Sequence, residues 1–175
     1  MAAGRQNLGV MGWMTGATRP RYEESDIESD EDFDDQAELH RYLDQLDRKG
    51  AVFTEASHII NTWDVAGMTL PLNHHGFVLK ASDGTYLNIH FVRSGLRWKP
   101  LEDRPALPVN AIHEKTYKCW AKPRELKQYC ADTGPWMVIA NDCRNWSEGL
   151  FEVMRIKEAP DLKWVNWPAV FRFPQ

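Results

Sequence analysis

The sequence is poor in cysteine and has no long hydrophobic run. Its three cysteines, Cys119, Cys130 and Cys143, are odd in number and widely spaced, which excludes a disulfide framework and a paired CxxC zinc pattern. No stretch of about 18 apolar residues predicts a membrane-spanning helix. Residues 1–20 also lack the continuous apolar segment of a secretory signal. We therefore expect a protein of the reducing cytoplasm or nucleus rather than a secreted one.

Basic residues are absent from residues 23–35, which hold nine of the 25 acidic residues of the chain. The remaining sequence has 16 acidic residues against 21 Lys and Arg, so the formal net charge of −4 hides a body of net charge +5. That body has no dense basic stripe, which argues against a nucleic-acid partner. We predict a disordered acidic tail over residues 1–33 and a single domain over residues 34–175.

The hydrophobic pattern predicts an α+β domain with a small antiparallel sheet packed against helices. An amphipathic spacing first appears at Leu39, Tyr42, Leu43 and Leu46, and Gly50 is the expected end of that helix. Further segments are predicted as follows: a helix or a strand pair over residues 51–63, a strand over 116–122, a helix after Pro123, and a helix over 143–156. Residues 93–115, rich in proline and arginine, are predicted to form a long loop.

The clearest hairpin of the sequence, residues 75–92, carries two histidines. With Asp83 and Gly84 as a two-residue turn, Phe77 pairs with His90 and His75 pairs with Val92. Side chains alternate along a strand, so this register places His75 and His90 close together on one face. Asn88 shares that face as a possible supporting residue. Asn141 and His74 are two more, although His74 points to the other face. An offset of one residue in the turn would exchange His74 and His75.

Cys143 is predicted to lie in the first turn of a helix, because Asn141 and Asp142 are both good N-cap residues. Backbone N–H groups and the helix dipole favour a thiolate there, so we expect the pKa of Cys143 to fall below about 8.5. The same N–H groups are suited to stabilising an oxyanion. The spacing of Trp146 and Leu150 places Cys143 at the end of the buried face of the helix. Cys119 and Cys130 are expected to be buried, inert thiols.

The segments NHHGFVLKASDGTYLNIHF and NDCRNWSEGLF resemble the H-box and the NC-box of circularly permuted papain-like proteins of the lecithin–retinol acyltransferase type. The resemblance covers about residues 70–155. It implies that Cys143 is a nucleophile, His75 its base and His90 the residue that orients His75. In that family Asn usually precedes Cys directly, whereas here Asp142 stands between Asn141 and Cys143. No cofactor is implied.

Three functional hypotheses follow from these observations. The first is a thiol hydrolase or acyltransferase acting on an ester, amide or thioester of a small molecule, lipid or peptide. The second is a catalytically inactive H-box/NC-type interaction module, as in some proteins of small RNA viruses, with a protein partner bound by the acidic tail or the aromatic C-terminus. The third, a metal site, has poor ligand spacing. Its candidate ligands are His74, His75, His90 and Cys143.

Overall fold

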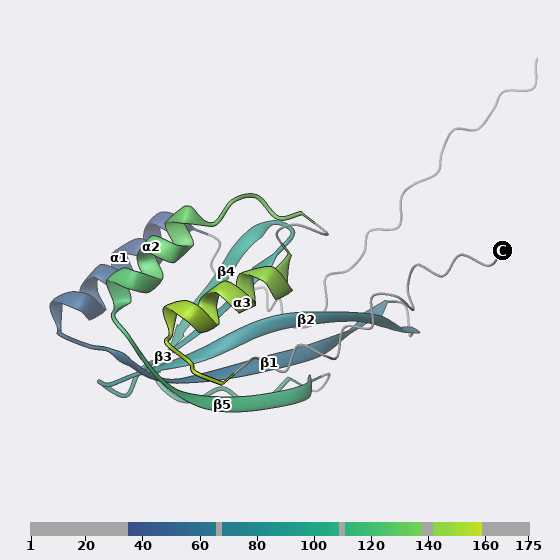
Figure 1. The fold of residues 1–175 in the computed structure, drawn as a ribbon, viewed down its shortest axis with the longest axis horizontal. Coiled ribbons are helices and arrows are strands. Elements are labelled where there is room, and N and C mark those ends of the chain that lie inside the picture. Colours follow the sequence, from purple (N-terminus) through teal and green to yellow (C-terminus); the bar gives the residue numbers. More distant parts are fainter. Residues whose placement is uncertain (1–34, 66–67, 109–110, 138–141, 159–175) are drawn as a thin grey trace, which may run out of the picture.

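The computed structural model describes residues 35–65, 68–108, 111–137 and 142–158. These residues form an α+β fold in which one face of a five-stranded antiparallel sheet is covered by three helices (Figure 1). The strands lie in the order β4-β3-β2-β1-β5. In chain order the elements are α1 (Gln36–Arg48), β1 (Phe53–Val65), β2 (Met68–Ala81), β3 (Tyr86–Val92), β4 (Gly95–Leu101), β5 (Ala111–Ala121), α2 (Pro123–Asp132) and α3 (Cys143–Val153). None of the described helices is long and apolar enough to cross a membrane.

The core lies between the sheet and the helices. Helix α3 packs on β2 and β3, and α2 contacts both α1 and α3. The aromatic contacts are dense at this interface, where Phe77 of β2 meets Trp146 and Phe151 of α3 edge to face. Helix α2 approaches α3 closely at Gly149, in the middle of α3. A Cβ atom at this position would lie 2.5 Å from the Tyr129 hydroxyl, so the close approach requires glycine.

The helix predictions are confirmed, and local capping explains why. The Asp35 side chain accepts hydrogen bonds from two N–H groups at the start of α1, and Gly50 follows the end of α1 with a φ of 71°. The Asp142 side chain caps α3 in the same way, accepting from the N–H groups of Arg144 and Asn145, both at 3.0 Å. The ambiguous segment 51–63 belongs to β1, which is paired with both β2 and β5.

The predicted register of the hairpin is wrong by one residue. His90 pairs with Gly76, not with Phe77, and the connecting loop has three residues. Gly84 donates its N–H to Ala81 and has a φ of 93°, while the Ala81 N–H bonds to Thr85. This is a type I turn followed by a left-handed glycine, which adds one residue to the two-residue turn that Asp-Gly suggested. A shift of one residue moves every paired side chain to the opposite face.

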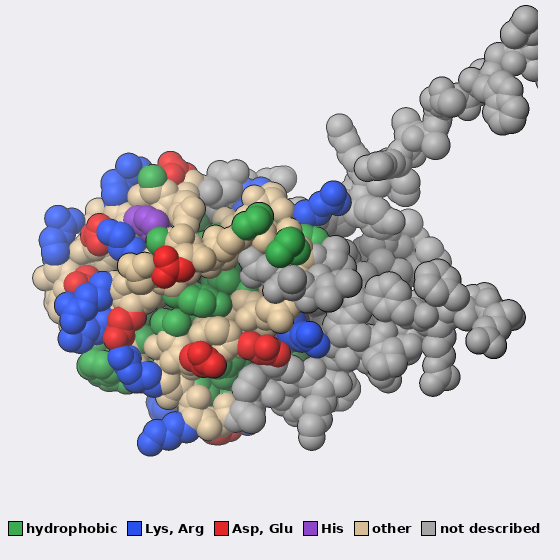
Figure 2. Space-filling model, turned by 45° about the horizontal axis from the view of Figure 1, so that its top comes forward, with side chains coloured by type: hydrophobic (Ala, Val, Ile, Leu, Met, Phe, Trp, Pro, Cys, Tyr) green, Lys and Arg blue, Asp and Glu red, His purple; other side chains and the backbone are tan. Residues whose placement is uncertain are grey.

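The long loop predicted over residues 93–115 is also wrong, because β4 occupies Gly95–Leu101 and β5 begins at Ala111. Strand β4 is an edge strand, and this position accommodates Pro100, which has no N–H for a further strand. The predicted tail over 1–33 and the aromatic C-terminus lie outside the described residues. On the face shown in Figure 2, Lys and Arg side chains lie among Asp and Glu side chains rather than in a stripe.

Candidate active site

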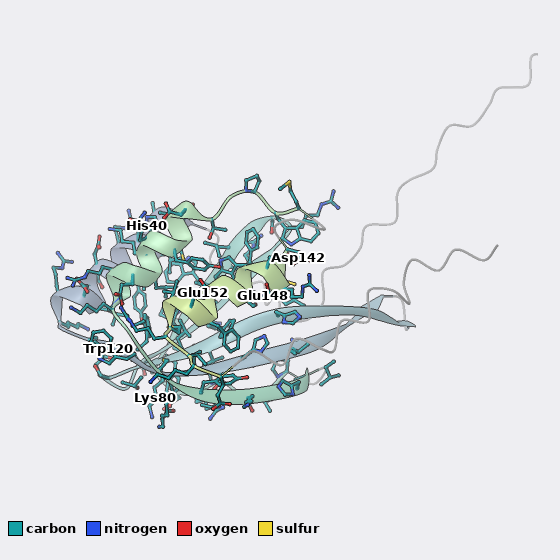
Figure 3. The ribbon with its side chains drawn as sticks, viewed as in Figure 1. His40, Lys80, Trp120, Asp142, Glu148 and Glu152 are labelled. Carbon is teal, nitrogen blue, oxygen red and sulfur yellow. The ribbon has the colours of Figure 1, made fainter. Side chains whose placement is uncertain are left out.

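Helix α3 places Cys143 over the end of the sheet that carries the histidines. Cys143 is the first residue of the helix, directly after the Asp142 cap, and its side chain is half-buried. Figure 3 shows Asp142 at this end of α3, with the exposed Glu148 and Glu152 farther along the helix. The backbone N–H of His75 lies close enough to the Cys143 sulfur to lower the pKa of the thiol. Cys143 and His75 therefore meet at the contact between α3 and β2, on the helix-covered face of the sheet.

His75 is paired with His58, a residue that the sequence analysis did not select. The two side chains come from neighbouring strands, and His58 Nε2 lies 3.1 Å from His75 Nδ1. Their rings are stacked with centroids 5.2 Å apart, and His58 also packs against Phe77 and Phe151. Within the described residues, His75 Nε2 has no hydrogen-bond partner. One nitrogen of His75 is thus held by a second imidazole while the other is available for chemistry.

Burial keeps both imidazoles neutral. The exposed fraction is 0% for His58 and 1% for His75. The loss of water around the rings lowers the pKa of His58 to about 3 and the pKa of His75 to about 4. The positive charge of Arg144 lowers the pKa of His75 further, and His113 acts on both histidines in the same direction. His113 belongs to β5 and pairs with Ile60, the residue that also pairs with His75. His113, too, was missed in the sequence.

The expected decrease in the pKa of Cys143 is wrong. Burial raises the pKa of the Cys143 thiol to about 12, and the Asp142 carboxylate adds to this effect. Backbone N–H groups of His75, Cys143 and Arg144 lower the pKa and offset only part of the increase. The helix terminus does stabilise a thiolate, as expected, but the desolvation of the sulfur is the larger effect. The resting site is therefore a neutral thiol beside a neutral imidazole.

His90, His74 and Asn88 lie on the opposite face of the sheet from Cys143, which corrects the predicted pairing of His75 with His90. His74 Nε2 lies 3.0 Å from His90 Nδ1, and both side chains are buried. Asn88 pairs with Val78, whose side chain is on this second face. The reason is the additional residue in the hairpin loop, which brings His74 rather than His75 beside His90. Asn141, the other predicted supporting residue, lies outside the described residues.

The other cysteines are reduced and have pKa values raised by burial, to about 11 for the half-buried Cys119 and about 12 for Cys130. Among the described residues no group of three or more His, Cys, Asp or Glu side chains is arranged to hold a metal ion. His58 was missed because residues 51–63 fitted both a helix and strands. Residues 56–61 are buried on both faces of β1, so no alternation of polar and apolar residues marks the face that carries His58.

Comparisons of the chain with protein-family models, with curated proteins and with solved structures gave no match.

Proposed function

We propose that this protein is a cysteine-dependent hydrolase or acyltransferase in which Cys143 is the nucleophile, His75 the base and His58 the residue that orients the base. The observation that carries the proposal is the state of the His75 ring. Its Nδ1 is held by His58 at 3.1 Å, and its Nε2 has no partner within the described residues. The backbone N–H of the same residue favours the thiolate form of Cys143 by lowering its pKa. A base held at one nitrogen beside a thiol is the arrangement that nucleophilic catalysis requires.

The fold part of the proposal is a permuted papain-like domain. It is supported by the order of the parts: the strands that carry His58 and His75 precede the helix that begins with Cys143. That helix packs directly on the histidine strand β2. The H-box and NC-box segments supply the sequence resemblance. In this arrangement His58 of β1 takes the orienting role that the sequence resemblance gave to His90 of β3.

The reaction is acyl transfer through a covalent thioester. His75 Nε2 takes the thiol proton as the sulfur attacks the carbonyl carbon of an ester, amide or thioester. This requires the tautomer in which His75 Nδ1–H donates to His58 Nε2. The Cys143 backbone N–H donates to the oxyanion, and the leaving group departs with the proton from His75. Water or a second acceptor, deprotonated by His75, then releases the acyl group and restores the thiol.

The competing function is a catalytically inactive interaction module on the same fold. The raised pKa of Cys143 favours it, because a thiol with a pKa of about 12 is about 0.001% thiolate at neutral pH. Catalysis from this resting state depends on transfer of the proton to His75 during attack on a bound substrate. The two functions therefore differ in whether acyl compounds are turned over, which is directly measurable.

The test is turnover of a panel of aryl esters, thioesters and amides, with detection of the acylated cysteine by mass spectrometry. We expect Cys143→Ser to abolish turnover and His75→Ala to reduce it by roughly 10²–10⁴-fold. Cys119→Ser and His40→Ala, which change the same residue types away from the site, should retain full turnover. Absence of turnover and of acyl-enzyme across the panel, or equal rates in Cys143→Ser and wild type, would identify the inactive module.

A second pair of variants tests the assignment of the orienting residue. His58→Asn removes the contact to His75 Nδ1 and should lower turnover. His90→Asn changes the pair on the opposite face of the sheet and should leave turnover unchanged. Both histidines are buried, so melting temperatures of the two variants serve as the control for folding. A larger loss of turnover in His90→Asn than in His58→Asn, at equal stability, contradicts the proposed role of His58.

A further inference from the structure

The sheet face opposite Cys143 contains a pocket that the proposed acyl transfer does not use. It has a volume of about 160 Å³ and opens between the sheet and the segment that follows β4. Its floor is Gly76 at the centre of β2, which is paired with Ile59 on one side and with His90 on the other. Gly76 has no side chain to fill this space. A hollow on the second face thus lies directly behind the His75 backbone.

The pocket has a roof that is anchored by polar contacts. Pro105, Ala106 and Pro108 line the side opposite the sheet. Next to them, Arg104 donates to Ser57 Oγ at 3.2 Å and forms an ion pair with Glu114. These contacts tie the segment to β1 and β5 on the same face. The roof is therefore attached to the sheet beside the pocket.

Asn61, one of the residues that line the pocket, has an unsatisfied hydrogen-bond acceptor. Asn61 is only 1% exposed, lines the pocket, and its Oδ1 has no hydrogen-bond partner within the described residues. Leaving a buried carbonyl oxygen unpaired destabilises a protein, so buried amides normally have partners. A ligand that donates a hydrogen bond to Asn61 Oδ1 would satisfy it.

The remaining lining restricts the chemistry of such a ligand. Apart from Asn88 and His90 the remaining lining is apolar: Ile59, Val78, Ala106 and the two prolines. The Arg104 charge beside the pocket is already neutralised by Glu114. An unpaired ligand charge would be costly to bury here. A cavity of roughly 150 Å³ accommodates benzene, so the space fits a single ring. The ring would lie beside the His90 imidazole and the proline roof, which are suitable surfaces for an aromatic ligand.

We propose that this pocket, lined by Asn61, Gly76, Val78, His90 and the 105–108 roof, binds a small neutral monocyclic aromatic molecule through one O–H or N–H donor. The ring occupies the space above Gly76, and its donor bonds to Asn61 Oδ1. This site is separate from the Cys143 site and does not depend on the proposed acyl transfer, because the sheet lies between the two.

The experiment is a titration of the full chain with phenol and with toluene, which lacks the donor, followed by NMR of the methyl groups of Ile59 and Val78. Phenol should cause saturable shifts of these methyl groups and bind roughly two- to tenfold more tightly than toluene. In Asn61→Leu, which keeps a similar side-chain volume without the acceptor, the preference for phenol should disappear.

Val78→Phe fills the pocket and should abolish binding, while Val92→Phe adds the same ring on β3 outside the pocket and should not. Melting temperatures show whether each variant is folded, and Asn61→Leu keeps the test decisive if Val78→Phe is not. The proposal is overturned if phenol causes no saturable shift of the pocket methyl groups. It is also overturned if toluene binds as tightly as phenol, or if Asn61→Leu retains the preference.

Discussion

The neutral resting state of Cys143 leads to a quantitative prediction for its alkylation. With a pKa of about 12 instead of about 8.5 for an unperturbed thiol, the thiolate fraction at pH 7 is lower by roughly 3,000-fold. A thiolate of higher pKa is the stronger nucleophile, and a Brønsted coefficient of about 0.4–0.5 returns a factor of roughly 25–55. The expected rate constant with iodoacetamide is therefore roughly a hundredfold below that of an unperturbed thiol.

The assay is time-resolved labelling by iodoacetamide, with the peptide that contains Cys143 quantified by mass spectrometry. The same peptide in the denatured protein is the unperturbed reference. Between about pH 6 and pH 9 the folded protein should be labelled about tenfold faster per pH unit, without a plateau, because the pKa lies above this range. His75→Ala should leave this slope unchanged, since His75, with a pKa of about 4, carries no charge there.

A plateau of the Cys143 labelling rate below about pH 8, or labelling faster than in the denatured reference, would refute this reasoning. Either result would show that the N–H groups at the start of α3 outweigh burial, and that Cys143 and His75 rest as an ion pair. If the plateau then began at a higher pH in His75→Ala, the His75 imidazolium would be identified as the group that stabilises the thiolate. Cys119, whose pKa is raised to about 11, is an internal comparison in the same sample.

Three further predictions concern stability. The folded protein holds His58 neutral down to about pH 3, whereas the unfolded chain is protonated below about 6.5, so acidification to pH 5 should lower the free energy of unfolding by about 2 kcal/mol for this residue. Urea unfolding at about pH 7.5 and pH 5 measures this loss of stability, which should be smaller in His58→Phe than in the wild type. Equal losses in the two proteins would refute the prediction. Gly149→Ala should destabilise the protein by about 1–3 kcal/mol despite its better helix propensity, because the added methyl group meets Tyr129. A double-mutant cycle with Tyr129→Phe should recover part of that cost, and a stabilised Gly149→Ala would contradict the close packing. Asp142→Ala should cost about 1 kcal/mol in thermal unfolding through loss of the α3 cap, and Asp142→Asn should cost less; equal losses would argue against the cap.

Local signals made the helices and the position of Cys143 predictable. Asp142 caps α3 through N–H groups two and three residues away, so this information lies within one short segment. Gly149 was unusual for a helix interior, and its cause is contact with Tyr129 on another helix. The Asp142 cap depends on residues next to it in the sequence, and the close approach at Gly149 depends on the absence of a side chain. Both signals are visible in the sequence.

The register of the hairpin was not predictable in the same way. The sequence around Asp83 and Gly84 is compatible with a two-residue turn and with a three-residue turn that ends in a left-handed glycine. Only the hydrogen bonds of Ala81 to Thr85 and Gly84 distinguish the two turns. The partner of His75 was equally inaccessible, because His58 lies 17 residues away on a strand whose pairing depends on the whole sheet.

The adjacent histidines of β2 explain why the predicted trio mixed two sites. His74 and His75 point to opposite faces, and each finds an imidazole on a different neighbouring strand: His75 pairs with His58 of β1, and His74 with His90 of β3. Both pairs are buried, but α3 covers only one face. Because Cys143 begins the helix that covers His75 and His58, the chemistry we propose belongs to that pair. The spacing of histidines along the sequence does not by itself identify the pair that acts. His90 of the second pair instead lines the pocket above Gly76, and burial lowers the pKa of its partner His74 well below the usual value.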